Sequence, residues 1–222
     1  MAALAAPHSR EKVMLSTAYQ AAFRQALATG LADGSFPSQY NTAQLWDFSS
    51  FPLATPSVDL GSGVFLHLTD GRTHRTGKWG VSYADRTILG AAQRQAVGQV
   101  YAHSPADSIH LFASGSVMGE YCKSYPSDWD WMLATTGVRR TLALSGDIHR
   151  NAQDEFAGTQ FPLYEATSSG AGVKELVVFG NDCQNYGVVE LDASHVNIQL
   201  YAHNTLEPQL RRRIVRSSWA QG

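Results

Sequence analysis

Residues 146–149 (Gly-Asp-Ile-His) contain two side chains that commonly bind metal ions in proteins. The glycine allows the chain to turn tightly after a buried strand, so that the carboxylate of Asp147 and the imidazole of His149 point at neighbouring positions. This pair of ligands suits Zn, Fe or Mn, and a carboxylate can bridge two ions. Arg150 follows directly, and its planar guanidinium can bind a phosphate group. The alternative interpretation is an aspartate that caps a helix beside a surface histidine.

A second polar segment, residues 70–75 (DGRTHR), contains two arginines and a histidine. In a functional interpretation either Arg72 and Arg75 recognise an anion or Asp70 holds a ligand-bearing loop in place. His74 is a proton donor or an ordinary surface histidine. Asp-Gly is also a common turn, and arginines beside it are often only solvated. The segment therefore has two interpretations, an anion site or an ordinary surface turn.

Both segments follow predicted strands. The chain alternates between apolar strand-like runs and helical patterns at residues 64–69, 89–102, 108–113, 128–136 and 140–144. Such alternation predicts parallel strands joined by right-handed crossovers. In open α/β sheets the reactive residues gather at the carboxyl ends of the strands. A third polar segment, residues 165–170 (EATSSG), also follows a predicted strand, so we expect three loops around one crevice.

The remaining chain divides into segments of different character. The sequence predicts a helix over 9–30, an irregular segment over 31–60, a sheet-and-helix core over 61–205 and a basic tail over 206–222. The later part of the core is expected to be all β, with strands at 161–166, 174–178, 187–191 and 196–201, the last two forming a hairpin. The scattered histidines, His67 and His110 among them, are expected to be structural.

Composition excludes several classes of protein. The chain has 222 residues, 44% of them hydrophobic, which suits one domain with a proper core. A net charge of −2 disfavours a general nucleic-acid binder. The sequence contains no apolar stretch long enough to cross a bilayer. The first residues lack a basic region and are too short for a secretory signal, so the chain as it stands is predicted to be cytoplasmic, unless an export signal lies outside it.

From residue 65 to residue 187 the order of motifs resembles the PhoD-type alkaline phosphatases and phosphodiesterases, a branch of the metallophosphoesterases. The matching segments are DGRTHR at 70–75, LGAAQ at 89–93, DWDW at 128–131, LSGDIH at 144–149, EATSSG at 165–170 and NYG at 185–187. In the family the first segment has threonine where this chain has Gly71. Family motifs that supply an early strand aspartate, a Gly-Asp-x-x-Tyr and a Trp-Asp-Asp-His-Glu turn do not occur before residue 60.

The resemblance implies an α/β fold with some α+β character: a metallophosphatase-like two-sheet sandwich flanked by helices, without its N-terminal half. It implies that Asp147 and His149 bind Fe, Zn, Mn or Ca ions, which lower the pKa of a bound water towards ~7. By the same resemblance Arg72, Arg75 and Arg150 bind the phosphoryl group, with Arg72 and Arg150 also neutralising charge during reaction.

The implied substrate is a small phosphate ester, a monoester or a diester, and His74 is the expected proton donor to the leaving oxygen. Many relatives in this family are exported. The alternative is a non-catalytic remnant or a binding or structural subunit of the same fold, in which a second copy or a partner subunit covers the surface that the missing half would bury.

Overall fold

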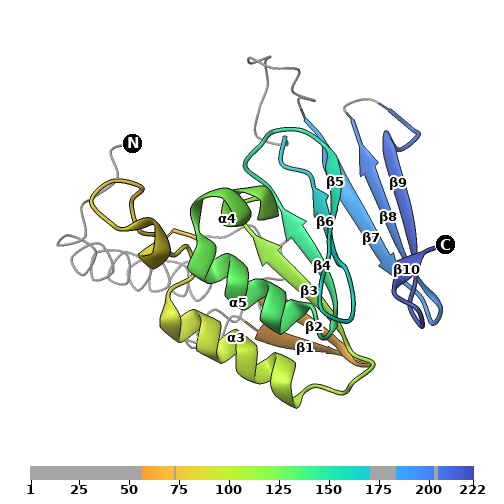
Figure 1. Ribbon diagram of the computed structural model, residues 1–222. Coiled ribbons are helices and arrows are strands. Elements are labelled where there is room, and N and C mark those ends of the chain that lie inside the picture. Colours follow the sequence, from red (N-terminus) through yellow and green to blue (C-terminus); the bar gives the residue numbers. More distant parts are fainter. Residues whose placement is uncertain (1–56, 73, 171–183, 203–204) are drawn as a thin grey trace, which may run out of the picture.

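The structure of the chain is a computed structural model that describes residues 57–72, 74–170, 184–202 and 205–222. These residues form a mixed α/β structure with two β-sheets and a layer of helices (Figure 1). The first part contains β1 (Ser57–Gly61), β2 (Val64–Leu68), the short 3₁₀ helix η2 (Tyr83–Asp85), α3 (Ala91–His103), β3 (Ile109–Ser114), α4 (Met118–Ser124) and α5 (Pro126–Thr136). The second part contains β4 (Arg140–Ser145), β5 (Ala152–Phe156), β6 (Leu163–Thr167), β7 (Tyr186–Leu191), β8 (His195–Tyr201), β9 (Leu210–Val215) and β10 (Ala220–Gln221).

The larger sheet has six strands in the order β1-β2-β3-β4-β6-β5. Strands β2, β3, β4 and β6 are parallel to one another, while the edge strands β1 and β5 are antiparallel to their neighbours. Helix α3 connects β2 to β3, and helices α4 and α5 connect β3 to β4. The expected parallel pairing around β2, β3 and β4 is therefore confirmed. It places the carboxyl ends of three consecutive parallel strands at one edge.

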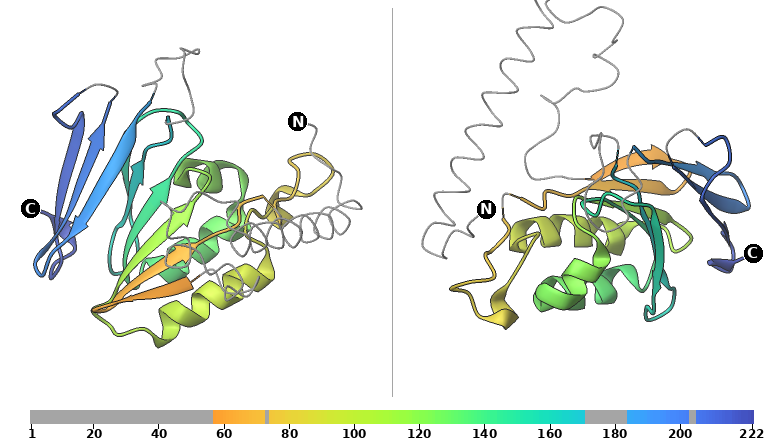
Figure 2. Two further views of the ribbon diagram at one scale, coloured as in Figure 1. Left: turned by 180° about the vertical axis from the view of Figure 1, so that it is seen from behind. Right: turned by 90° about the horizontal axis from the view of Figure 1, so that it is seen from above.

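The helices cover one face of this sheet, as the view from above shows (Figure 2). Their side chains pack on alternate residues of the strands, because successive strand residues point to opposite faces. The resulting core contains Val97, Tyr101, Met118, Tyr121 and Met132 from the helices, Tyr125 between α4 and α5, and Phe112, Ala143 and Leu163 from the sheet. Helix α5 begins with Pro126, which lacks an N–H that the first turn would leave unbonded.

The smaller sheet is antiparallel, with four strands in the order β10-β9-β8-β7. The predicted hairpin between β7 and β8 is confirmed, and Asp192 Oδ1 holds its turn by accepting bonds from the backbone N–H groups of Ser194 and His195, both at 2.7 Å. The two sheets pack face to face through a second core. It contains Val64, Ile109, Leu142 and Tyr164 from the large sheet and Val196, Ile198, Leu200, Ile214 and Trp219 from the small one.

The structure differs from the sequence-based expectation at both ends of the described chain. The irregular segment expected over 31–60 includes the start of strand β1, whose register with β2 places Ser57 opposite His67. The basic tail expected over 206–222 contains strands β9 and β10. Its alternate residues Leu210, Arg212 and Ile214 face the large sheet, so the arginines obscured a period-two pattern. The helix predicted over 9–30 and the strand predicted over 174–178 lie outside the described residues.

Among the described residues, no helix is long and apolar enough to cross a membrane.

Candidate functional site

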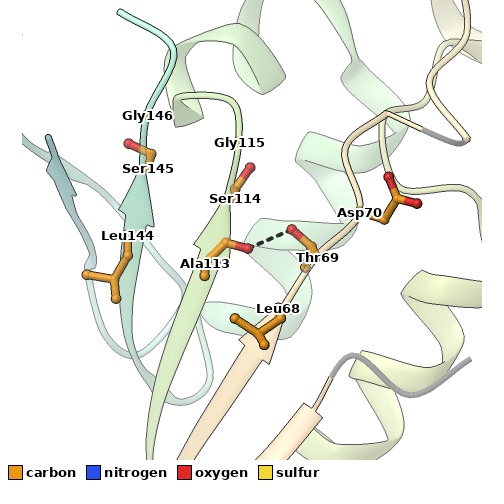
Figure 3. A pocket seen from close by; sticks show the side chains of 9 residues that line it. All are labelled: Leu68, Thr69, Asp70, Ala113, Ser114, Gly115, Leu144, Ser145 and Gly146. Carbon is orange, nitrogen blue, oxygen red and sulfur yellow. Dashed lines mark hydrogen bonds between the residues drawn. The ribbon is translucent and has the colours of Figure 1, made fainter. Parts of the chain in front are cut away.

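A hollow of about 450 Å³ lies at the carboxyl ends of β2, β3 and β4 (Figure 3). Each strand contributes residues at equivalent positions to the lining of the hollow, because neighbouring strands pair residue by residue. The lining residues are Leu68, Thr69 and Asp70 after β2, Ala113, Ser114 and Gly115 at the end of β3, and Leu144, Ser145 and Gly146 at the end of β4. The hollow therefore has a row of aliphatic side chains beside a row of hydroxyls.

The loop that follows β2 is held by helix α3. The side chain of Gln93 accepts a hydrogen bond from the backbone N–H of Asp70 at 2.7 Å and donates to the carbonyl of Asp70 at 3.1 Å. The carboxylate of Asp70 accepts the backbone N–H of Arg72 at 2.8 Å. Asp70 therefore fixes the turn from which Arg72 extends.

The loop that follows β4 turns sharply. Asp147 and His149 have φ angles of 76° and 54°, in the left-handed region where residues other than glycine are uncommon. The backbone N–H of His149 donates to Ser169 Oγ at 3.0 Å, and Ser169 also lies beside Gly146, where an added Cβ would approach its Cβ to 3.1 Å. The loop after β6 thus fixes the loop after β4. Strained backbone of this kind is concentrated at functional sites.

Two of the candidate site residues from different loops approach each other. A guanidinium nitrogen of Arg72 lies 4.0 Å from Asp147 Oδ1. The side chains are 78% and 54% exposed, so the pair contributes little to folding stability. Both groups instead remain accessible to a ligand, and they bring the loops after β2 and β4 together beside the hollow.

Arg75 lies in a more enclosed position. Its guanidinium donates to Tyr125 Oη at 2.8 Å and to Glu120 Oε1 at 3.2 Å, and it lies over the Tyr125 ring. Lys78 Nζ binds the same Glu120 oxygen at 2.7 Å. These contacts attach the loop after β2 to helices α4 and α5.

His74 and Arg150 have contrasting surroundings. His74 packs against Gly90, where an added Cβ would lie 2.9 Å from the Cβ of His74. Arg150 is exposed, and its side chain has no hydrogen-bond or ion-pair partner within the described part of the chain. The structure brings together Arg72 and Asp147, and it leaves Arg150 exposed on the loop that also carries His149.

Sequence reasoning did not single out Glu165 as an individual residue. Glu165 is 1% exposed, on the helix-covered face of β6, where its Oε1 accepts the backbone N–H of Met118 at 2.8 Å. Burial raises the pKa of its carboxyl group, and a hydrogen bond from Ser145 acts in the opposite direction. Ser145 lines the hollow and bonds Thr167 Oγ1 at 2.6 Å. A lone buried acid in a strand pattern is the signal that could have identified it.

The described residues supply an incomplete metal site. Asp147 and His149 are donors of the appropriate types, a carboxylate and an imidazole. No group of three or more His, Cys, Asp or Glu side chains that could hold a metal ion occurs among residues 57–72, 74–170, 184–202 and 205–222. A structural or catalytic ion usually has three or four protein ligands. The described residues therefore do not by themselves fit a metal centre.

Comparisons with protein-family models, with curated proteins and with solved structures found no match to this chain.

Proposed function

We propose that this chain is a PhoD-like, metal-dependent phosphoester hydrolase that binds the phosphate group where the loops after β2 and β4 meet. The observation that supports this proposal most directly is the 4.0 Å approach of Arg72 to Asp147 beside the hollow. A phosphate between these loops would place its negative charge against an accessible guanidinium, which binds phosphate oxygens with parallel N–H groups.

In this proposal each residue of the chain has a distinct task. Arg72 and Arg150, both exposed, bind and neutralise the phosphoryl group, and Arg75 contributes positive charge from its position beside Glu120. His74 supplies a proton to the leaving oxygen. Asp147 and His149 contribute ligands to Fe, Zn, Mn or Ca, and the remaining ligands come from residues outside the described ones or from another chain.

The same proposal relates the fold to that of the metallophosphatases. Two facing sheets with helices on one side agree with half of a metallophosphatase-like sandwich. The aliphatic side chains Leu60 and Leu68, 54% and 43% exposed, lie on β1 and β2. A second copy or a partner subunit that covers this part of the sheet would bury them.

The two-ligand count among the described residues favours a second candidate function. A chain that supplies only Asp147 and His149 would bind a phosphate ester through its arginines without hydrolysing it, as a binding or structural subunit of the same fold. The two candidates differ in metal content and in turnover, and both can be measured on the same preparation.

The first experiment is metal content per chain, by plasma mass spectrometry after incubation of the purified full chain with each ion. We expect stoichiometric metal that is lost in Asp147→Ala and in His149→Ala. The matched controls are Asp192→Ala and His195→Ala, since these residues form a surface pair of the same types 3.8 Å apart. Metal equally absent from wild type and all variants would overturn the hydrolase proposal.

The second experiment is binding of inorganic phosphate and hydrolysis of p-nitrophenyl phosphate and bis-p-nitrophenyl phosphate. Arg72→Ala should weaken phosphate binding about 10- to 100-fold, the value of a charge-assisted hydrogen bond. Arg211→Ala is the control, because Arg211 is similarly exposed but lies on β9. Phosphate binding without turnover in the metal-loaded chain would favour the binding subunit. An unchanged affinity in Arg72→Ala would contradict both candidates.

A further inference from the structure

Two fully buried histidines lie on the helix-covered face of the large sheet, at its β1 edge. His67 on β2 and His110 on β3 have no exposed surface, and their rings are stacked 5.1 Å apart and nearly parallel. His67 Nε2 lies 2.8 Å from His110 Nδ1, a hydrogen-bond distance. Buried imidazoles need a partner for each ring nitrogen. The hydrogens on the two rings can therefore be assigned from the hydrogen bonds that they make with each other and with the neighbouring serines.

The assignment starts from the serine hydroxyls at one end. Ser104 Oγ donates to the carbonyl of Tyr101 at 3.0 Å, and Ser108 Oγ donates to Ser104 Oγ at 3.1 Å. Ser108 Oγ also lies 2.8 Å from His110 Nε2. Ser104 Oγ lies 3.1 Å from the same nitrogen. In the arrangement in which Ser108 donates to Ser104, His110 Nε2 carries the hydrogen and donates to Ser108.

The other ring follows from this step. A neutral His110 with its hydrogen on Nε2 has an acceptor at Nδ1, so His67 Nε2–H donates to it. The remaining nitrogen, His67 Nδ1, is then an acceptor, and Ser57 Oγ donates to it at 2.7 Å. Every donor and acceptor in the series Ser57, His67, His110, Ser108 and Ser104 is satisfied when both rings are neutral.

The surroundings oppose protonation of either ring. Tyr101 stacks on His110 at 3.9 Å and on His67 at 4.9 Å, and Phe65 stacks on His110 at 5.2 Å. Burial lowers the pKa of His110 most, and the neighbouring His67 and the guanidinium of Arg139 lower it further. On β1, the carboxylate of Asp59 is exposed and bonds Gly61 N–H, and neither ring has a carboxylate partner in the described structure.

Added protons have a defined effect on this series. One proton on His67 Nδ1 reverses the bond with Ser57 and leaves a positive charge without a carboxylate partner among the described residues. A second proton places two N–H groups face to face at the His67–His110 contact, and this contact must then open. In the described part of the chain β1 pairs with β2 alone, and Ser57 on it is half-buried, so lifting β1 would open the His67 end of the series to water.

We propose that the series Ser57–His67–His110–Ser108 is an acid-sensitive lock that holds edge strand β1 on the sheet while both imidazoles are neutral and releases it on acidification. Burial supports the direction, since it lowers the pKa of His67 to about 4 and of His110 to about 3. The stabilising effect is complete above the ordinary histidine pKa of about 6.5 and is lost as the pH falls towards 4. None of the lock residues lines the hollow, although Leu68, which follows His67, does. The inference does not rest on the proposed hydrolase.

The direct test is a ¹⁵N NMR titration of the histidine rings in the full chain between pH 8 and pH 4.5. We expect both rings to remain neutral with the hydrogen on Nε2 down to about pH 5, and the amide protons of 57–61 to lose protection below that pH, ahead of those of β4. A ring charged at pH 6, a hydrogen on Nδ1 in either ring at pH 7.5, or β1 protection that stays parallel to β4 would overturn the proposal.

A variant gives the matching quantitative test. His110→Phe keeps an aromatic ring in contact with Phe65 and Tyr101 but removes one titrating group. For each buried neutral histidine the folding equilibrium constant falls about tenfold per pH unit below 6.5. Between pH 6 and pH 5 the folding constant of the variant should therefore fall about tenfold less than that of the wild type. The control is His103→Phe, because His103 is exposed at the end of α3 and lies outside the lock. An unchanged pH slope in His110→Phe contradicts the proposal, and if that variant does not fold, the wild-type NMR titration decides.

Discussion

Asp128 shows how one residue positions the candidate site from a distance. Its carboxylate is fully buried at the start of α5 and accepts bonds from Thr87 Oγ1 at 2.8 Å, from Leu89 N–H at 3.0 Å and from Ile88 N–H. Arg94 of α3 lies 3.4 Å away as its counter-charge. Asp128 therefore fixes the turn that leads into Gly90, against which His74 packs.

We predict that Asp128→Asn destabilises the protein by about 2–4 kcal/mol. The neutral amide leaves the positive charge of Arg94 without its counter-charge, and its NH₂ group faces the N–H and O–H donors that the carboxylate accepted. Urea unfolding followed by circular dichroism measures the change. Asp130→Asn is the control on the same helix, since Asp130 is exposed, and it should remain within about 0.5 kcal/mol of wild type. Equal effects of the two substitutions would contradict the role given to Asp128.

Gly90 offers a second residue-scale prediction. It has a φ of 73°, and an added Cβ would lie 2.9 Å from the Cβ of His74. Gly90→Ala should therefore destabilise the protein by about 1–3 kcal/mol and displace His74. Gly98→Ala in helix α3 is the matched control: an added Cβ there would lie 3.7 Å from its nearest neighbour, Trp131 Nε1. We expect it to stabilise by about 0.5–1 kcal/mol. Thermal unfolding of both variants measures the two changes in stability. A Gly90→Ala variant as stable as the wild type would show that the turn at residue 90 adjusts to the added Cβ.

At the scale of elements, β9 and β10 close the core between the sheets. Trp219 precedes β10, is fully buried, donates from Nε1 to the carbonyl of Pro162 at 3.0 Å and packs edge-on against Tyr164. Ile214 of β9 is equally buried in the same core. The C-terminal segment therefore stabilises the contact of the small sheet with the large one.

We predict that Trp219→Ala costs about 3–5 kcal/mol, the usual effect of removing a buried tryptophan. The control is Trp79→Ala, because Trp79 is 80% exposed, and it should change stability by less than about 0.5 kcal/mol. Differential scanning calorimetry of both variants provides the comparison. A Trp219 variant with a wild-type transition would mean that the C-terminal strands do not belong to the cooperative unit.

The elements that sequence predicted well are those with strong local patterns. Strands β2, β3, β4, β7 and β8 and helices α3 and α5 have long apolar runs or clear turns, and their bounds agree within about two residues. Strands β1 and β5 were not anticipated because their residues are mixed in polarity and lie at sheet edges. Strand β9 was hidden by three consecutive arginines, although Arg212 packs over Tyr164 and bonds Glu155.

The site was predictable in position but only partly in contacts. The rule that polar loops meet at the carboxyl ends of parallel strands led to the loops that Arg72 and Asp147 occupy. The attachment of Arg75 to Glu120 and Tyr125 depends on how α4 packs, which no local pattern encodes. The burial of Glu165 behind the hollow likewise depends on the whole sheet.

At the scale of the whole molecule, buried titratable groups set opposite limits on the pH range of stability. The two buried histidines favour unfolding as the pH falls below about 6.5, since the unfolded chain binds more protons than the folded one. Glu165 acts in the other direction. Burial raises the pKa of its carboxyl, so its folded form holds a proton that the unfolded chain releases, and stability is lost as the pH rises through the folded-state value.

Glu165→Gln separates these two effects. Glutamine keeps an oxygen that accepts the N–H of Met118 and remains neutral at every pH, so it mimics the protonated acid. We predict that the variant gains stability relative to wild type as the pH rises from 5 to 8, while its acid limb is unchanged. Urea unfolding at unit steps of pH measures the difference, with Glu190→Gln as an exposed control on β7. Parallel curves for wild type and Glu165→Gln would mean that Glu165 is ionised in the folded protein. In that case Ser145 and the Met118 N–H would stabilise its charge, and the hollow would lie beside a buried anion that disfavours phosphate.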